Sequence, residues 1–80
     1  MSAMEQLEEI ISSEKKWARE RAEVAKAIHQ QYEKGNLSDS EYKELLEDII
    51  RTDRLDQDAD DIELRNNLVS GINGLVKIIS

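Results

Sequence analysis

The chain contains no cysteine and no proline, and each absence removes a class of structure. Without cysteine, disulfides, thiolate metal sites and a thiol nucleophile are excluded. Without proline, and with only three glycines in the chain, no residue between Gly35 and Gly71 forces a helix to stop. Phenylalanine is absent too, and aromatic residues make up 4% of the chain. A Gly-rich phosphate loop is also missing, so the sequence offers little from which to build a catalytic pocket.

Long apolar runs are lacking as well. The longest stretch in which apolar residues predominate extends over 68–79, far short of the ~20 residues that a membrane-spanning helix needs. Glu5, Glu8 and Glu9 interrupt any apolar run near the first residue, so nothing there resembles a signal peptide. We therefore expect a cytoplasmic protein with no membrane contact. Its 80 residues predict a single domain, 1–80, with a marginal core.

Charged residues, in contrast, are abundant at 36% of the chain, above the ~25% of typical domains. The net charge of −7 is concentrated, because 38–63 holds eleven acids and three bases, a net −8. A phosphate backbone repels such a chain, so we do not expect direct nucleic-acid binding. The segment could instead meet a protein with a basic surface. The predicted acidic partner surface consists of Asp53, Asp56, Asp58, Asp60 and Asp61.

The segment 32–42 predicts the end of one helix and the start of another. Gly35 can close a helix in the left-handed conformation without a Cβ penalty. Ser38 can cap the next helix, with Glu41 completing a capping box, and Leu37 and Tyr42 have the spacing of a hydrophobic staple. A turn this short lays its two helices side by side.

Helices are predicted over about 3–34, 39–54 and 57–79. Ser2 and Glu5 have the spacing of a capping box at the start of the first. In all three helices the apolar residues recur with the helical period. These residues are Leu7, Ile10, Ile11, Trp17, Ala18, Ala22, Val24, Ala25, Ile28 and Tyr32, then Tyr42, Leu45, Leu46, Ile49 and Ile50, then Leu68, Val69, Ile72, Leu75, Val76 and Ile79.

The apolar pattern of 39–54 breaks at Asp53. We therefore predict a kink or a short break within 52–58, with Asp56 or Asp58 as the N-cap of the helix that follows. The expected fold class is all-α: an antiparallel helical hairpin whose second arm is kinked or broken, giving two long or three helices.

The apolar stripe of 3–34 is too broad for one short helix to cover. The sequence therefore favours self-association into an oligomeric helical bundle, with a homodimer as the first expectation. The residues predicted to contact a partner are Leu7, Ile10, Ile11, Trp17, Ile72, Leu75, Val76 and Ile79.

Asp56, Asp58 and Asp60 have the spacing of the first three ligands of an EF-hand loop. The sixth position holds Asp61 where that loop needs glycine, and the twelfth holds Asn67 where it needs glutamate. We interpret the segment as an acidic turn at the start of a helix, and we predict neither a metal nor another cofactor.

Three other patterns favour structural interpretations. His29, the only histidine, has no Ser or Asp at a diagnostic spacing for catalysis. Ser70, Gly71 and Gly74 are interpreted either as small residues that permit close helix packing or as a sign of fraying near the end of the helix. A basic zone is interleaved with acids, which predicts a salt-bridged helix surface that could also meet the acidic segment. The zone consists of Lys15, Lys16, Arg19, Arg21 and Lys26.

The predicted function is that of a non-enzymatic protein that binds other proteins, as an assembly factor, adaptor or regulator that self-associates. The alternative is an acidic inhibitor that mimics nucleic acid and binds a basic protein through 38–63. A nucleic-acid-binding accessory role through the basic zone is a third hypothesis, which the net charge opposes.

Overall fold

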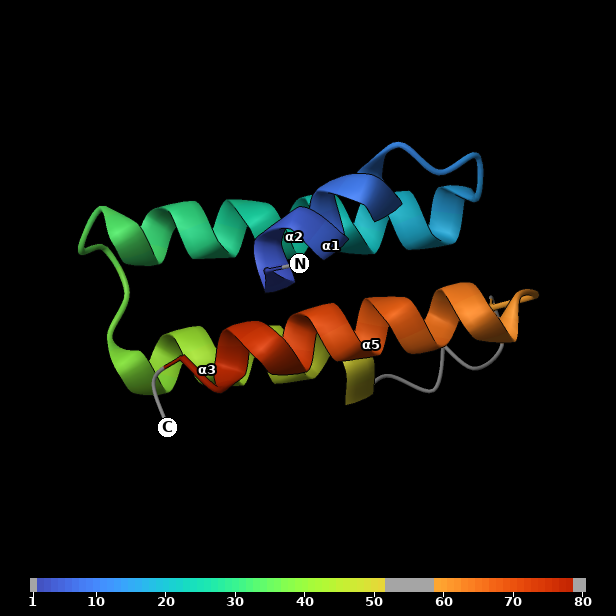
Figure 1. The fold of residues 1–80 in the computed structure, drawn as a ribbon. Helices are drawn as coiled ribbons and strands as arrows, with labels where there is room; N and C mark the ends of the chain where they lie inside the picture. Colours follow the sequence, from blue (N-terminus) through green and yellow to red (C-terminus); the bar gives the residue numbers. More distant parts are fainter. Residues whose placement is uncertain (1, 52–58, 79–80) are drawn as a thin grey trace.

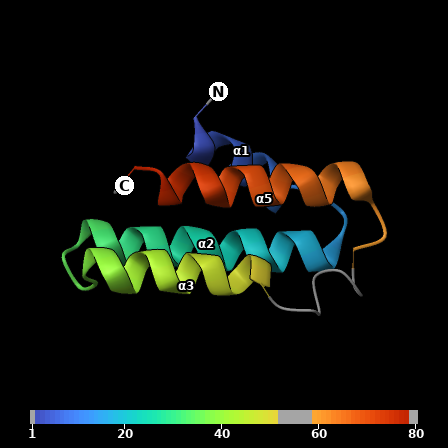
Figure 2. The same cartoon turned by 90° about the horizontal axis from the view of Figure 1, so that it is seen from below.

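The computed structural model describes residues 2–51 and 59–78, and this part of the chain is all-helical, as predicted. The helices in it are α1 (Ala3–Ile11), α2 (Lys16–Glu33), α3 (Asp39–Arg51) and α5 (Ile62–Val76). They form two layers, with α1 and α2 above α3 and α5 in Figure 1. α2 and α3 lie side by side and run in opposite directions, and α5 lies against α1 and α3 (Figure 2).

The end of α2 has the conformation that its sequence predicted. Gly35 has a φ of +81°, in the left-handed region that favours glycine. The amide of Gly35 donates to the carbonyl of Tyr32, and the amide of Asn36 donates to the carbonyl of Gln31, both at 3.0 Å. These two bonds form a Schellman motif, which satisfies the last carbonyls of the helix.

The capping box predicted at Ser38 and Glu41 is complete, and the one predicted at Ser2 and Glu5 is present in part. The Glu41 amide donates to Ser38 Oγ at 3.1 Å, and the Ser38 amide donates back to the Glu41 carboxylate at 3.0 Å. The bond from the Ser38 amide favours the ionised carboxylate and lowers the pKa of Glu41. At the start of α1, the Glu5 amide donates to Ser2 Oγ at 3.2 Å. Local hydrogen bonds therefore fix where α1 and α3 begin.

The prediction of one continuous helix over 3–34 is wrong, because α1 ends at Ile11 and α2 begins at Lys16. At this break the Lys15 amide donates to Ser13 Oγ at 3.1 Å. Ser12 donates its hydroxyl to the carbonyl of Glu8 at 3.5 Å. Serine side chains compete in this way with the helical hydrogen bonds of the backbone. The break lets α1 fold back onto α2 and α5.

The start of the last helix also differs from its prediction. α5 begins at Ile62 rather than at 57, and its N-cap is Asp61, whose carboxylate accepts from the Leu64 amide at 3.0 Å. The predicted caps, Asp56 and Asp58, and the predicted break at 52–58 lie outside the described residues. A carboxylate in the cap position satisfies a free amide and complements the positive end of the helix dipole.

The four helices of the described ranges all contribute to one core between the layers. Among the described residues Tyr42 is the largest fully buried side chain, and α2 contributes only alanines to the fully buried set. The small side chains of α2 allow its neighbours to approach closely. The buried core residues are Leu7, Ile10, Ala18, Ala22, Ala25, Tyr42, Leu46, Leu68, Ile72 and Leu75.

Candidate functional site

The residues predicted to contact a partner lie largely inside the chain. Leu7, Ile10, Ile72 and Leu75 are core residues, and Ile11, Trp17 and Val76 are partly buried against that core. Ile79 lies outside the described residues. The break at Ser12–Lys15 places the apolar side of α1 on α2 and α5, so one chain covers most of its own stripe. The argument for self-association from surplus apolar surface therefore fails for these residues, and oligomerisation stays an untested prediction.

Gly71 and Gly74 serve close helix packing, which was one of their two predicted interpretations. A Cβ added to Gly74 would lie 2.7 Å from the Cβ of Ala3, and one added to Gly71 would lie 3.0 Å from Cδ2 of Leu7. The first distance is shorter than real Cβ contacts, and the second is so tight that the Leu7 side chain would have to shift. The two glycines therefore hold α1 against α5, which explains why they occur inside a helix despite a cost of up to ~1 kcal/mol each relative to alanine.

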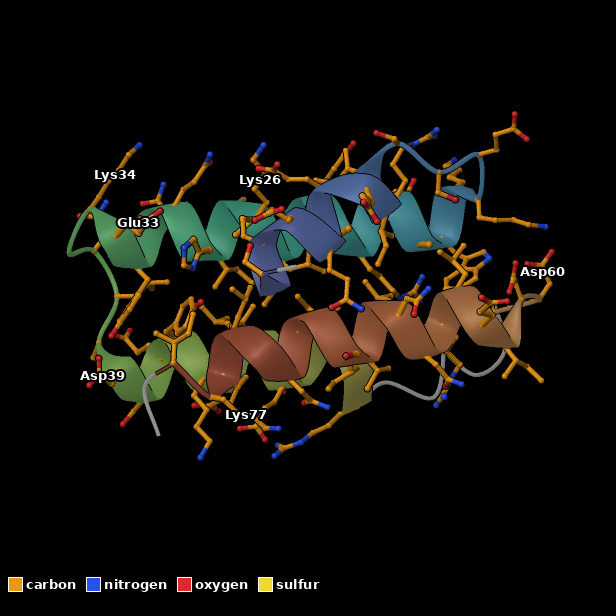
Figure 3. The ribbon with its side chains drawn as sticks, viewed as in Figure 1. Lys26, Glu33, Lys34, Asp39, Asp60 and Lys77 are labelled. Carbon is orange, nitrogen blue, oxygen red and sulfur yellow. The ribbon has the colours of Figure 1, made fainter. Side chains whose placement is uncertain are left out.

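The predicted acidic partner surface is divided by the fold. Asp53, Asp56 and Asp58 lie outside the described residues, and Asp61 caps α5. Asp60 lies at the end of the bundle where α2 begins (Figure 3), with Oδ2 2.9 Å from Lys15 Nζ.

Asp60 holds two donors from the start of α2. Its second carboxylate oxygen accepts a hydrogen bond of 3.1 Å from the Trp17 indole. Hydrogen bonds from Lys15 and then Trp17 lower the pKa of Asp60, and the bond to Asp60 raises the pKa of Lys15. Asp60, the third aspartate of the EF-hand-like spacing, therefore already has two partners within the chain.

The basic zone is a salt-bridged surface, as predicted. Besides the Lys15 pair, Lys16 lies 3.7 Å from Glu20 and Lys26 lies 3.8 Å from Glu8 of α1. Arg21 donates to the carbonyl of Trp17 at 3.0 Å. Within the described part of the chain, intramolecular contacts occupy four of the five cations, all but Arg19, which weakens the hypothesis of a nucleic-acid site.

His29 belongs to a polar and aromatic cluster between α2 and α3 that was not predicted from the sequence. Its Nδ1 shares a hydrogen bond of 2.7 Å with the hydroxyl of the fully buried Tyr42, and its Nε2 lies 3.4 Å from the Glu33 carboxylate. Tyr32 stacks on Tyr42 with ring centroids 4.2 Å apart, and its hydroxyl donates to Asp39. Burial raises the pKa of Tyr42 to about 12.

This cluster ties α2 to α3 at the end of the bundle opposite Asp60, where Figure 3 shows Glu33 and Asp39. The Tyr42 hydroxyl is buried and stays protonated at neutral pH. Its hydrogen bond goes to the His29 imidazole, so it is not left open to a ligand. A signal for the cluster was present in the sequence, because His29 and Tyr32 share a helix flank and Tyr42 follows directly after the turn. We interpret it as structural.

Unpaired acids lie instead along the outer side of α3. Glu44 and Asp48 are exposed and have no ion-pair partner within the described residues. Glu41 lies one helical turn before Glu44 and two turns before Asp48, and its carboxylate accepts a hydrogen bond from the Ser38 amide. Residues spaced i, i+3 and i+7 share one side of a helix. Glu41, Glu44 and Asp48 therefore form an acidic row.

Apolar side chains lie beside this row. Val24 is 49% exposed and Leu45 40% exposed, although both belong to stripes that predicted burial. Ile28 lies three positions after the buried Ala25 on α2, and Leu45 lies three positions after the buried Tyr42 on α3. In two antiparallel helices, residues at the same offset from the buried positions lie on the same side of the helix pair. Because α2 and α3 are antiparallel, Ile28 and Leu45 share one side of the pair.

We call this surface the α2–α3 face. Lys26 pairs with α1 and is two residues from Val24, which places Val24 on the flank of α2 away from α1. The face therefore lies on the side that α1 and α5 leave uncovered (Figure 2). It includes the apolar Val24, Ile28 and Leu45 and the acidic Glu41, Glu44 and Asp48, and Arg21 shares this side of α2 with Val24 and Ile28 at the spacing i, i+3 and i+7.

Open depressions occur on the surface. One of about 360 Å³ is lined by Lys16, Trp17, Glu20 and Arg21, beside the α2–α3 face. Two others, of about 400 and 520 Å³, adjoin α5. In the described ranges, no three His, Asp or Glu side chains come together as a metal site. None of the helices described has the length and apolar character that a bilayer crossing requires.

Comparison with protein-family models, with curated proteins and with solved structures found no match to this chain.

Proposed function

We propose that this protein acts by binding another protein that presents a basic surface, as a non-enzymatic accessory or regulatory factor. The observation that carries the proposal is the acidic row of α3, in which Glu44 and Asp48 have no counter-charge in the described chain. Ionised groups of one sign on one surface steer and select a partner of the opposite sign. The net charge of −7 acts in the same direction.

The same row argues against a homodimer through this side of the bundle. A two-fold axis brings the same patch of both copies together. Glu41 and Asp48 of one copy would then face acids of the other, and like charges destabilise such a contact. Self-association through the helix faces remains the weaker candidate, since its predicted contact residues lie mainly in the core.

The nucleic-acid-mimicking inhibitor is a special case of a basic partner. In that case the acids of α3 would occupy a groove that otherwise binds a phosphate backbone. Competition decides the point: double-stranded DNA displaces the protein from such a partner and leaves another basic partner bound.

The test is capture of a partner on the immobilised protein at about 50 and about 300 mM salt. Glu44→Lys with Asp48→Lys reverses the charge of the acidic row. Glu9→Lys with Glu23→Lys makes the same change in charge at exposed positions of α1 and α2. We expect the wild-type protein to capture a partner in a salt-sensitive way. The Glu44/Asp48 variant should lose this capture, and the Glu9/Glu23 variant should keep it. Equal capture by both variants, or capture that salt does not weaken, would refute the proposal.

A further inference from the structure

The α2–α3 face combines a narrow apolar row with acids on one edge. Val24 and Ile28 are spaced i, i+4 on α2, and Leu45 projects beside them from α3. The ridges of two packed helices can receive one row of side chains from a third helix. An open depression of about 360 Å³ lies nearby on α2, beside Trp17.

The backbone of this face limits the ways in which a partner can bind. α2 and α3 satisfy their own amides and carbonyls along their lengths, so the face offers no strand edge to which an extended peptide could add. Recognition must use side chains. Apolar contacts at i, i+3, i+4 and i+7 of an amphipathic helix match a row of this kind.

The charge on the edge selects the partner further. Glu44 and Asp48 have no ion pair in the described chain, and Glu41 stays ionised on the Ser38 amide. Lysine or arginine beside the apolar row of a bound helix would pair with these carboxylates. An acidic helix would be repelled.

From these observations, and resting on the proposed function, we infer that the α2–α3 face binds a basic amphipathic helix of the partner protein. The apolar row of that helix lies along Val24, Ile28 and Leu45, and its cations face Glu41, Glu44 and Asp48.

The test uses defined peptides of ~18 residues, long enough to form a helix when bound. One peptide carries leucines in an amphipathic helical pattern among lysines. A second has the same composition in scrambled order, and a third has glutamate in place of lysine. Binding to the full chain is measured by isothermal titration. Val24→Ser with Leu45→Ser alters only exposed positions, and Ile62→Ser, at a residue 75% exposed at the start of α5, is the matched control.

We expect the amphipathic lysine peptide to bind about tenfold more tightly than the scrambled one, and the glutamate peptide not to bind. The Val24/Leu45 variant should lose this preference, while the Ile62 variant keeps it. Circular dichroism of the variants must show unchanged helicity.

Other outcomes separate the two proposals. Equal binding of both lysine peptides, or a preference that survives Val24→Ser with Leu45→Ser, overturns the helix-binding inference and leaves a basic partner possible. Failure of every lysine peptide to bind at low salt overturns the proposed function as well. A dimer in sedimentation that the Val24/Leu45 variant dissociates would show that a second copy occupies the face, which also overturns the inference.

Discussion

Trp17 and Asp60, 43 residues apart in the chain, are joined by a 3.1 Å hydrogen bond from the indole Nε1 to the carboxylate. The same carboxylate binds Lys15. α2 has no side-chain N-cap and no acid in its first turn. Asp60, supplied by the segment that leads into α5, therefore places a negative charge close to the positive end of the α2 dipole.

Asp60→Asn should lower stability at neutral pH. The folded pKa of Asp60 lies below its usual 3.8, so its carboxylate stabilises the fold above that pH. This contribution is lost as the pH falls through the lower, folded pKa. The Tm of the variant should therefore lie below that of the wild type at pH 7 and converge with it as the pH falls below the folded pKa.

Two observations check this pH dependence. Glu9→Gln, at an exposed position, should follow the wild type at every pH. Emission from Trp17, the only tryptophan, should shift in the Asp60 variant, because the acceptor of its indole hydrogen bond loses its negative charge. A Tm difference that does not change with pH would contradict the assignment.

Tyr42→Phe should lower the free energy of unfolding by about 1–2 kcal/mol, because it leaves His29 without its buried partner. Tyr32→Phe loses only an exposed bond to Asp39 and should cost less. Since burial raises the pKa of Tyr42 from 10.0 to about 12, wild-type stability should fall as the pH rises across that interval. Urea titrations of both variants measure the difference, and a larger loss for Tyr32→Phe would contradict the account.

Gly74→Ala should destabilise the protein by about 1 kcal/mol. Alanine in a helix gains up to ~1 kcal/mol over glycine, but overpacking typically costs 1–3 kcal/mol. The clash is with the Cβ of Ala3, so Ala3→Gly in the same chain should recover the loss. Urea denaturation of the single and double variants measures this coupling. Simple additivity of the two changes would show that the helices do not meet here.

Gly35→Ala should cost about 1 kcal/mol for a different reason. A Cβ at this position meets nothing within 4 Å, but the φ of +81° is strained for any residue with a side chain. Asparagine tolerates this conformation better, so Gly35→Asn should cost less. Thermal unfolding of the two variants measures the order, and an equal cost would contradict a conformational cause.

Local signals in the sequence predicted much of the fold. Gly35, Ser38 and Glu41 act through hydrogen bonds to residues a few positions away, and these signals placed the start of α3 correctly. The break at Ser12–Lys15 was missed because its cause is not local. Ser12 and Ser13 by themselves only weaken a helix. The break is stabilised by a tertiary contact, the burial of Leu7 against α5.

The candidate site was predicted less well. The acidity of 38–63 is a property of composition, and the sequence showed it. The role of each acid depends on tertiary contacts: Asp60 and Asp61 are held within the chain, whereas Glu44 and Asp48 face solvent. Likewise, helical periodicity assigns Leu45 to an apolar stripe, but only the position of α2 decides how much of it stays exposed.

The most direct test of the account is NMR mapping of amide shifts as the amphipathic lysine peptide is added to the full chain. We expect the largest changes at Val24, Ile28, Leu45 and Asp48, on the α2–α3 face. Changes concentrated instead at Gln6 and Asn73, which line the depression between α1 and α5, would contradict it.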